Sequence, residues 1–348
     1  MKMKAVAKSK PGPGLQLIEA EVPKPGPGEV LVKVKYASIC GSDVHIYKWD
    51  EFAQSSLTKL PRIIGHESAG EIVELGPGVK GLKVGDYVGV ETHIACGHCY
   101  QCKIGKPHVC RNSKILGFHV DGAFAEYMVI PAENAWKVPD TIPRDWVPLM
   151  EPMGNAVHTV LSDEITGKNV LVVGTGPIGA MAVAVAKAAG ARKVIATDIN
   201  DFRLRIARKM GADIVLNPEI DDVRTVVMEE TGGNGVDVVL EMSGNPNALN
   251  QGLDLITNGG WVGLLGIYGK NRIDVPMNDV IMKNLTLYGI VGRKMFSTWV
   301  VTTALLESGK VDLSPLITHR VTLEEYEEAF NVIFQGRAMK VMFEIDPS

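Results

Sequence analysis

The feature that most constrains the fold of this 348-residue chain is a glycine pattern between an apolar run and a helix-forming segment. Residues 170–173 have the composition of a buried β-strand, and Gly174-Thr175-Gly176-Pro177-Ile178-Gly179 follows directly. An alanine-rich, helix-like segment comes next, and the following predicted strand ends at Asp198. An acidic residue about 20 positions after such glycines is typical of a dinucleotide-binding unit. The pattern therefore predicts a Rossmann domain.

The same residues indicate which dinucleotide binds. The glycines let the backbone approach a pyrophosphate, and the helix N-terminus offers unpaired N–H groups to its charge. Asp198 can accept hydrogen bonds from both adenosine ribose hydroxyls and would repel a 2′-phosphate, so NAD is favoured over NADP. Arg203 weakens this preference slightly, because a guanidinium can stack on adenine or bind a phosphate. A glycine-rich turn that serves only strand–helix packing is the alternative.

The chain shows two different patterns of predicted secondary structure. The first third consists of short β-branched runs between Pro/Gly turns, whereas strand-like and helix-like segments alternate from residue 167 onward. Such alternation predicts βαβ units and a doubly wound parallel sheet. A chain of 348 residues also exceeds the usual size of a single core. We expect a β-rich catalytic domain in residues 1–155, a Rossmann domain in 156–291, and a return of the chain to the first domain in 292–348. The alternation includes a helix-like segment at residues 248–257, and after about residue 291 we expect helix up to a last strand at 340–345.

Four of the five cysteines lie close together in the sequence. They are Cys96, Cys99, Cys102 and Cys110. Four thiolates at such short spacing match a closed tetrahedral zinc site, which has no open position and is therefore structural. We expect this zinc to stabilise a lobe at about residues 91–115. An iron–sulfur cluster, a redox pair or ordinary cysteines are the alternatives.

The fifth cysteine, Cys40, remains for a second metal. The pair His66-Glu67 and the isolated Glu151 could complete its ligand set. One thiolate, one imidazole and carboxylate oxygens leave a position open for water or a substrate oxygen, and an open zinc lowers the pKa of a bound hydroxyl. Each piece alone is weak evidence, since a lone cysteine is usually a small buried hydrophobe. Together with a nucleotide site they predict a catalytic zinc.

Composition excludes several classes of partner. The net charge is −4 with a pI of about 6.1, and no basic cluster is present, which argues against nucleic acid as a partner. The most apolar stretch, residues 178–186, is too short to span a membrane. The odd number of cysteines and the absence of a signal-like N-terminus predict a reducing, cytoplasmic location.

The motifs together resemble a known superfamily. Gly65-His66-Glu67-Ser68-Ala69-Gly70 matches the signature of the zinc-containing medium-chain dehydrogenases/reductases, and the resemblance extends over nearly the whole chain. The runs at residues 40–47, 91–94, 151–157 and 289–296 are most similar to the L-threonine 3-dehydrogenases within it. One departure is Ser42, where those enzymes usually carry threonine. The hydroxyl is kept, so packing rather than chemistry is affected.

The resemblance implies a fold and a reaction. The fold is a GroES-like β-rich catalytic domain plus a Rossmann domain. The reaction is NAD-dependent oxidation of the secondary hydroxyl of L-threonine to 2-amino-3-ketobutyrate, with two zinc ions per subunit, in a homotetramer. A polyol or 2,3-butanediol dehydrogenase is the alternative, and an NAD-binding protein without turnover is a more distant one.

The resemblance also implies roles for single residues. Cys40, His66 and Glu67 would bind the catalytic zinc, and Glu151 would lie in or just beyond its ligand shell. Ser42 and His45 would relay the substrate proton to water through the nicotinamide ribose, and His93 would line the substrate pocket. The alternatives are an ordinary surface histidine at position 45 and a purely structural role for His93. The remaining residues would contact NAD, and the apolar ones among them could instead be buried strand ends. They are Gly174, Gly176, Ile178, Gly179, Asp198, Arg203, Leu265, Gly266, Ile267, Ile290 and Val291.

Overall fold

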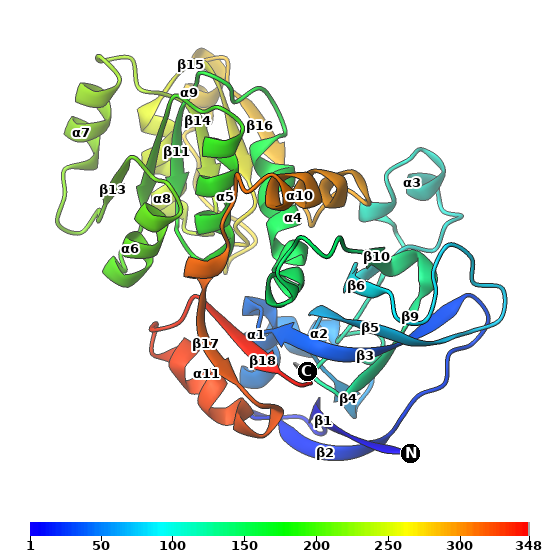
Figure 1. Ribbon diagram of the computed structural model, residues 1–348. Helices are drawn as coiled ribbons and strands as arrows, with labels where there is room; N and C mark the ends of the chain where they lie inside the picture. The colour runs from blue at the N-terminus through cyan, green and yellow to red at the C-terminus, as the bar shows by residue number, and fades with distance from the viewer. Residues whose placement is uncertain (347–348) are drawn as a thin grey trace. The chain divides into compact units, whose positions relative to one another are not determined.

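The computed structural model describes residues 1–346 and divides the chain into two compact units (Figure 1). Within the described residues, the first unit comprises 1–151, 294–299 and 317–346, and the second comprises 152–293 and 300–316. The stretch 300–316 thus belongs to the second unit, although its position in the sequence suggested the first. Across residues 1–346, every helix is too short or too polar to span a lipid bilayer.

The first unit is mostly β-structure, with short helices at its loops. Its strands are β1 (Lys2–Lys8), β2 (Gln16–Glu21), β3 (Glu29–Ser38), β4 (Arg62–Ile63), β5 (Glu67–Leu75), β6 (Tyr87–Val90), β7 (His93–Ile94), β8 (Lys114–Ile115), β9 (Tyr127–Pro131), β10 (Ala135–Lys137), β17 (Ile317–Val321) and β18 (Lys340–Glu344). Its helices are α1 (Gly41–Lys48), α2 (Glu51–Ser56), α3 (Tyr100–Lys103) and α11 (Tyr326–Phe334).

Strand β3 is the centre of the largest sheet, whose order is β10-β6-β5-β3-β18-β17, with β9 also pairing with β3. The apolar run of β3 is buried along most of its length, as expected for a strand with neighbours on both sides. Ser38 at its end pairs with Glu67 of β5 and with Met342 of β18. The end of β3 and the starts of β5 and β18 therefore meet at one end of the sheet, and this is where α1 begins.

The second unit is an α/β layer. Its strands are β11 (Asn169–Val173), β12 (Lys193–Thr197), β13 (Ile214–Leu216), β14 (Val236–Glu241), β15 (Ile256–Leu264) and β16 (Thr286–Gly289). Its helices are α5 (Pro177–Ala188), α6 (Asp201–Lys209), α7 (Val223–Glu230), α8 (Pro246–Leu255) and α9 (Met277–Met282). Helices α4 (Met150–Val160) and α10 (Ser297–Glu307) each have residues in both units.

All six strands of this unit run parallel in the order β13-β12-β11-β14-β15-β16. This is the Rossmann order, which reverses direction between β11 and β14. Helix α5 packs beside α6, and α7 packs beside α8. Because crossovers between parallel strands are right-handed, these two pairs cover opposite faces of the sheet (Figure 1). The predicted doubly wound fold is confirmed.

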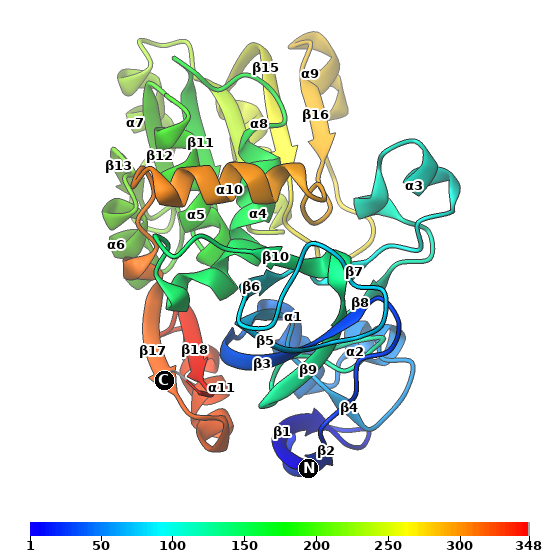
Figure 2. The ribbon, with the colours of Figure 1, turned by 45° about the vertical axis from the view of Figure 1, so that its right-hand side comes forward.

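Two details differ from the sequence prediction. The helix expected at residues 248–257 ends at Leu255, and β15 begins at once, because Ile256 already pairs with Val236 of β14. The region after residue 291, expected to be helical up to the last strand, also contains β17. This short strand lies beside β18 as its parallel partner (Figures 1 and 2). In both segments the secondary structure is set by pairing with a distant strand, which local sequence propensity does not predict.

Candidate active site

Three predicted metal ligands come together in the first unit. Cys40, His66 and Glu67 each offer one ligand atom, and these atoms all lie within 4.8 Å of one another. Cys40 follows β3 and is the N-cap residue of α1, whereas His66 and Glu67 stand at the start of β5. The chain thus supplies a sulfur, an imidazole nitrogen and a carboxylate at one point, which is a set that suits zinc.

Asp43, which the sequence analysis missed, places its carboxylate near the histidine ring. Its Oδ1 lies 3.6 Å from Nδ1 of His66, and its Oδ2 accepts a hydrogen bond of 2.9 Å from the backbone N–H of Cys40. Within residues 1–346 neither that Nδ1 nor that Oδ1 has a hydrogen-bond partner, although both are buried. A carboxylate on one ring nitrogen leaves Nε2 of His66 for a metal.

The charges at this point favour a cation. Burial lowers the pKa of His66, but the Asp43 carboxylate and the Cys40 sulfur outweigh burial and raise this pKa to about 10. Burial likewise raises the pKa of Asp43 to about 6, and the positive charge on His66 opposes that rise. The proton on His66 thus offsets the negative charge of the groups around it. A bound metal ion would offset the same charge in its place. The residues present fit zinc.

Glu67 already has a cationic partner. Nζ of Lys340 lies 2.5 Å from each carboxylate oxygen, and it also donates to the carbonyl of Ile39 at 3.2 Å. Ser38 Oγ donates to the same carboxylate. Burial lowers the pKa of Lys340, but the charges of Glu67 and Cys40 raise it overall. Glu67 can still bind a metal because a carboxylate has about four acceptor positions.

Glu151 lies outside this close group. Its side chain is buried in the first turn of α4, and its carboxylate raises the pKa values of both His66 and Lys340. Glu151 is therefore electrostatically coupled to the metal group, but its oxygen atoms are not among those within 4.8 Å of one another.

A glycine before the histidine is required by packing. Gly65 has a φ of +90°, and a Cβ atom at this position would come within 2.2 Å of the Phe124 ring. A side chain here would displace the buried Phe124 and with it the turn that presents His66. This is a physical reason for the glycine in the Gly-His-Glu motif.

The two predicted relay residues stand one turn apart on α1. Ser42 and His45 are separated by three positions and so share a face of this helix. Nδ1 of His45 lies 2.5 Å from Oδ2 of Asp50, the N-cap residue of α2. The His45 side chain is 52% exposed, which suits a group that exchanges protons with solvent.

His93 is held by a buried carboxylate. Glu91 accepts hydrogen bonds from the backbone N–H of His93 at 2.8 Å and from the Trp299 indole at 2.7 Å. Nδ1 of His93 lies 3.2 Å from Oε1 of the same glutamate. This fixes the His93 ring, and none of these contacts assigns it to a substrate.

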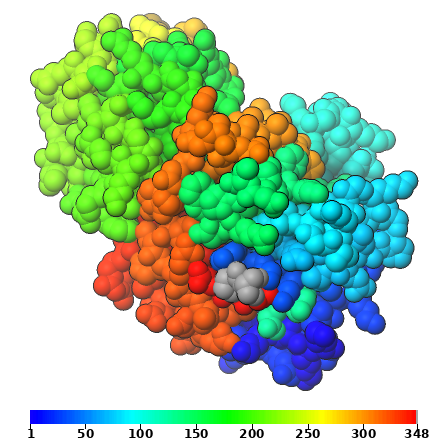
Figure 3. Space-filling view, in the orientation of Figure 1, coloured from blue at the N-terminus to red at the C-terminus, as the bar shows by residue number. Residues whose placement is uncertain are grey.

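The four clustered cysteines form a lobe at the surface of the first unit, cyan in Figure 3. Their sulfur atoms lie within 4.8 Å of one another. Sγ of Cys99 is 3.5 Å from Sγ of Cys102 and 3.7 Å from Sγ of Cys110. Tetrahedral Zn–S bonds of about 2.3 Å place sulfur atoms about 3.8 Å apart. The lobe is thus already shaped for a zinc ion.

The acidities of these thiols also fit a cation. Backbone N–H donors, first that of His98, lower the pKa of Cys96 to about 6. Desolvation and the sulfur atoms of Cys99 and Cys110 raise the pKa of Cys102 to about 12. Cys102 therefore resists ionising beside its neighbours, and a divalent metal would remove that conflict.

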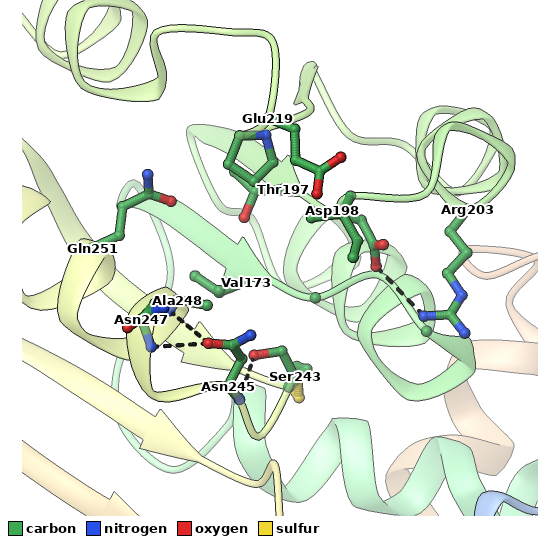
Figure 4. A pocket seen from close by; sticks show the side chains of 15 residues that line it. Val173, Thr197, Asp198, Arg203, Glu219, Ser243, Asn245, Asn247, Ala248 and Gln251 are labelled. Carbon is green, nitrogen blue, oxygen red and sulfur yellow. Dashed lines mark hydrogen bonds and ion pairs between the residues drawn. The ribbon is translucent and has the colours of Figure 1, made fainter. Parts of the chain in front are cut away.

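In the second unit, four of the predicted nucleotide residues line a pocket of about 540 Å³, namely Gly174, Gly176, Asp198 and Arg203 (Figure 4). Gly174 has a φ of +87°, and a Cβ there would touch Ser243; a Cβ on Gly179 would come within 2.0 Å of the Gly174 carbonyl. At Gly176, the N-cap residue of α5, a Cβ would meet nothing within 4 Å. This open space faces helix N–H groups and fits a pyrophosphate. Ile178 follows in the first turn of α5.

Two backbone donors hold Asp198 in the same pocket. Its Oδ2 accepts from the Thr175 N–H at 2.7 Å, and its Oδ1 accepts from the Asn200 N–H at 2.9 Å. Nη1 of Arg203 lies 3.9 Å from Oδ2, and the two side chains point toward each other (Figure 4). An ordered carboxylate is what ribose hydroxyls need as an acceptor.

The predicted nicotinamide-flanking residues follow two neighbouring strands. Leu265, Gly266 and Ile267 follow β15, and Ile290 and Val291 follow β16. Ile267 is 85% exposed and Val291 is 55% exposed, so these two residues are not buried strand ends. Their exposure fits apolar walls for a ligand.

A buried glutamate that the sequence analysis missed joins the loops that follow β14 and β15. Glu241 ends β14, and its Oε1 accepts from the N–H groups of Ser243 at 2.8 Å and Gly244 at 2.9 Å. Its Oε2 accepts from the Tyr268 hydroxyl at 3.1 Å, and its carbonyl accepts from Leu265 N–H at 3.0 Å. The two loops at the carboxyl ends of β14 and β15 therefore share one support.

Comparison with known proteins agrees with this geometry. Residues 26–140 match the family model of the alcohol dehydrogenase GroES-like domain, and residues 177–308 match that of the zinc-binding dehydrogenases. The expected GroES-like and Rossmann domains are confirmed, as are the zinc-dependent and nicotinamide-dependent classes.

Full-length relatives are also found. The chain is 56% identical to the L-threonine 3-dehydrogenase of Pyrococcus horikoshii over 344 residues, covering 98% of each chain. A short chain alcohol dehydrogenase of Escherichia coli, crystallised with NADH, superposes with a TM-score of 0.90 at 34% identity over 99% of each chain. The 2R,3R-butanediol dehydrogenase of Bacillus subtilis superposes with a TM-score of 0.90 at 30% identity, covering 99% of this chain and 100% of that one.

Proposed function

Because this chain belongs to the L-threonine 3-dehydrogenase family of zinc-containing medium-chain dehydrogenases/reductases, we propose that it oxidises the 3-hydroxyl of L-threonine. The products would be 2-amino-3-ketobutyrate, NADH and a proton. The observation that carries this proposal is the group of Cys40, His66 and Glu67, which supplies an open metal site in a chain of this family. A cytoplasmic location and a homotetramer remain predictions.

Cys40 and His66 would hold the catalytic zinc, with Glu67 or Glu151 as the carboxylate ligand. The four-cysteine lobe would hold a second, structural zinc, which gives two ions per chain. A zinc ion bound at Cys40 would supply a Lewis acid for the substrate hydroxyl. The support is the closeness of the ligand atoms and the excess negative charge around His66.

The chain's own residues would then remove the hydroxyl proton. Ser42 Oγ would accept this proton as its own proton moves on, and His45 would receive the relayed proton and release it to water. Histidine suits this step because its two ring nitrogens can accept and release a proton near neutral pH. The placement of both residues on one face of α1 supports the assignment.

NAD would bind along the Rossmann unit and would supply the hydride acceptor. The pyrophosphate would lie at Gly174 and Gly176, and the adenosine ribose at Asp198. Support comes from the open space at Gly176 and from the two backbone donors that orient the Asp198 carboxylate.

The direct test is a comparison of substrates. Purified protein loaded with zinc is assayed for NADH formation from L-threonine, sorbitol and 2,3-butanediol at equal concentrations. We expect the highest kcat/KM with L-threonine. A preference for 2,3-butanediol would replace the proposal with the second candidate, which the likeness to the Bacillus subtilis butanediol dehydrogenase supports.

Replacing the ribose acceptor tests the choice of NAD. In Asp198→Asn the length of the side chain is kept and its charge is lost, so the repulsion of a 2′-phosphate falls. We expect the ratio of kcat/KM for NAD to that for NADP to fall about tenfold, which corresponds to about 1.4 kcal/mol. Steady-state rates with each cofactor measure the ratio.

Glu219 supplies the matched control. This exposed carboxylate lines the same pocket, but its backbone N–H bonds Asn217 and its side chain has no role in the proposal. Glu219→Gln should leave the cofactor ratio within about twofold. An equal change in both variants would mean that the general charge of the pocket, rather than Asp198, selects the cofactor.

A further inference from the structure

The turn between α1 and α2 brings the carboxylate of Asp50 into contact with His45, the relay histidine. Helix α1 ends at Lys48, and its C-cap residue Trp49 has a left-handed backbone (φ 59°) that turns the chain back. Asp50 follows as the N-cap residue of α2. Oδ1 of Asp50 accepts from the Ala53 N–H at 3.2 Å, while Oδ2 lies 2.5 Å from Nδ1 of His45. One side chain thus joins the helix cap to the imidazole.

We propose that Asp50 is a positioning residue of the proton relay, which holds the N–H of His45 Nδ1 so that Nε2 is the proton acceptor. This inference rests on the proposed function, in which His45 passes the substrate proton to solvent. A carboxylate only accepts, so its partner nitrogen must carry the hydrogen, and the neutral ring then has its lone pair on Nε2. In each turnover Nε2 gains the relayed proton and then releases it to water. No oxidation state changes in this step.

An aromatic row connects this pair to the metal group. The His45 ring lies 5.4 Å from the Phe52 ring, Phe52 lies 6.0 Å from Phe118, and Phe118 lies 5.8 Å from the His66 ring, all between centroids. Phe52 belongs to α2, the helix that Asp50 caps. Asp50 therefore fixes both the histidine and the helix that carries the next ring in the row.

The charged groups near His45 single out Asp50. Lys48 is in the last turn of α1, and Glu51 is in the first turn of α2. Oδ2 of Asp50 is the ion-pair partner of His45 within the described chain, and the contact lowers the pKa of Asp50 against the opposing effect of burial. The alternative is that Asp50 only caps α2.

Asparagine separates the two readings. Asn is as good an N-cap residue as Asp, so Asp50→Asn keeps the bond to Ala53. Its amide would donate to Nδ1, which forces the hydrogen onto Nε2 and removes the acceptor. We expect kcat with L-threonine to fall about tenfold, with the KM for NAD and the melting temperature unchanged. Imidazole added as a small base should restore part of the rate. Glu51→Gln, next in sequence, should match the wild type.

His45→Asn is measured in parallel so that the two ideas fail separately. If His45→Asn is slow and Asp50→Asn turns over at the wild-type rate, the positioning role is wrong and the relay stands. If His45→Asn itself is as fast as the wild type, the relay is wrong. A slow Asp50→Asn with a lowered melting temperature and no rescue by imidazole would assign Asp50 to the cap alone and overturn the inference.

Discussion

Cys40→Ser is expected to lower kcat about 10³-fold or more, while NADH still binds with nearly the wild-type affinity. Cys40 is the sulfur of the group that also contains His66 and Glu67, and a hydroxyl is a much poorer zinc ligand than a thiolate. A metal ion stabilises the transition state by several kcal/mol, and loss of that stabilisation corresponds to a rate decrease of about 10³-fold. The residues proposed to contact the cofactor lie in the second unit and should not be affected. Turnover, zinc content by elemental analysis and NADH fluorescence check the three expectations.

Cys99→Ser is the matched control for this experiment. It also removes one thiolate and should also reduce zinc from two ions to one per chain, but the lost ion is the one in the surface lobe. We expect lower thermal stability with the chemical step preserved in the fraction that remains folded. If wild-type protein contains one zinc per chain at full activity, the assignment of two sites is wrong.

Much of the site could be predicted because its parts are local in sequence. The spacing of Cys96, Cys99, Cys102 and Cys110 brings four sulfurs together within one short lobe, and the structure places them within 4.8 Å. The glycine fingerprint is likewise contained in a single strand–turn–helix unit, whose Rossmann order is confirmed. In both cases the functional residues are so close in sequence that any fold keeps them close in space.

Residues that act across strands or turns left weaker signals. Lys340 reaches Glu67 over 273 positions, and the sequence predicted only that it begins a strand. Asp50 contacts His45 because Trp49 adopts a left-handed conformation, which is uncommon for a non-glycine residue. Asp43 alone had a usable signal, since its place three residues after Cys40, in the first turn of a helix, is that of a side chain that bonds back to the cap.

Lys340→Met is expected to lower the free energy of unfolding of the zinc-free protein by about 3–5 kcal/mol. The ammonium lies 2.5 Å from each oxygen of Glu67, and the two residues are only 2% and 0% exposed. Methionine fills similar space, so the cost arises from a buried carboxylate whose cation is gone. The remaining donor, Ser38 Oγ, cannot neutralise that charge. Urea unfolding at neutral pH after chelation measures the change.

Two comparisons isolate burial as the cause. Adding Glu67→Gln to Lys340→Met removes both charges and should recover most of the lost stability, because no unpaired ion remains. Lys2 and Glu19 form a pair at the same 2.5 Å, but their side chains are 62% and 63% exposed, so Lys2→Met should cost less than about 1 kcal/mol. If Lys340→Met costs no more than Lys2→Met, Lys340 does not neutralise Glu67 in solution. Lys340 would then occupy none of the acceptor positions on Glu67 that a metal could use.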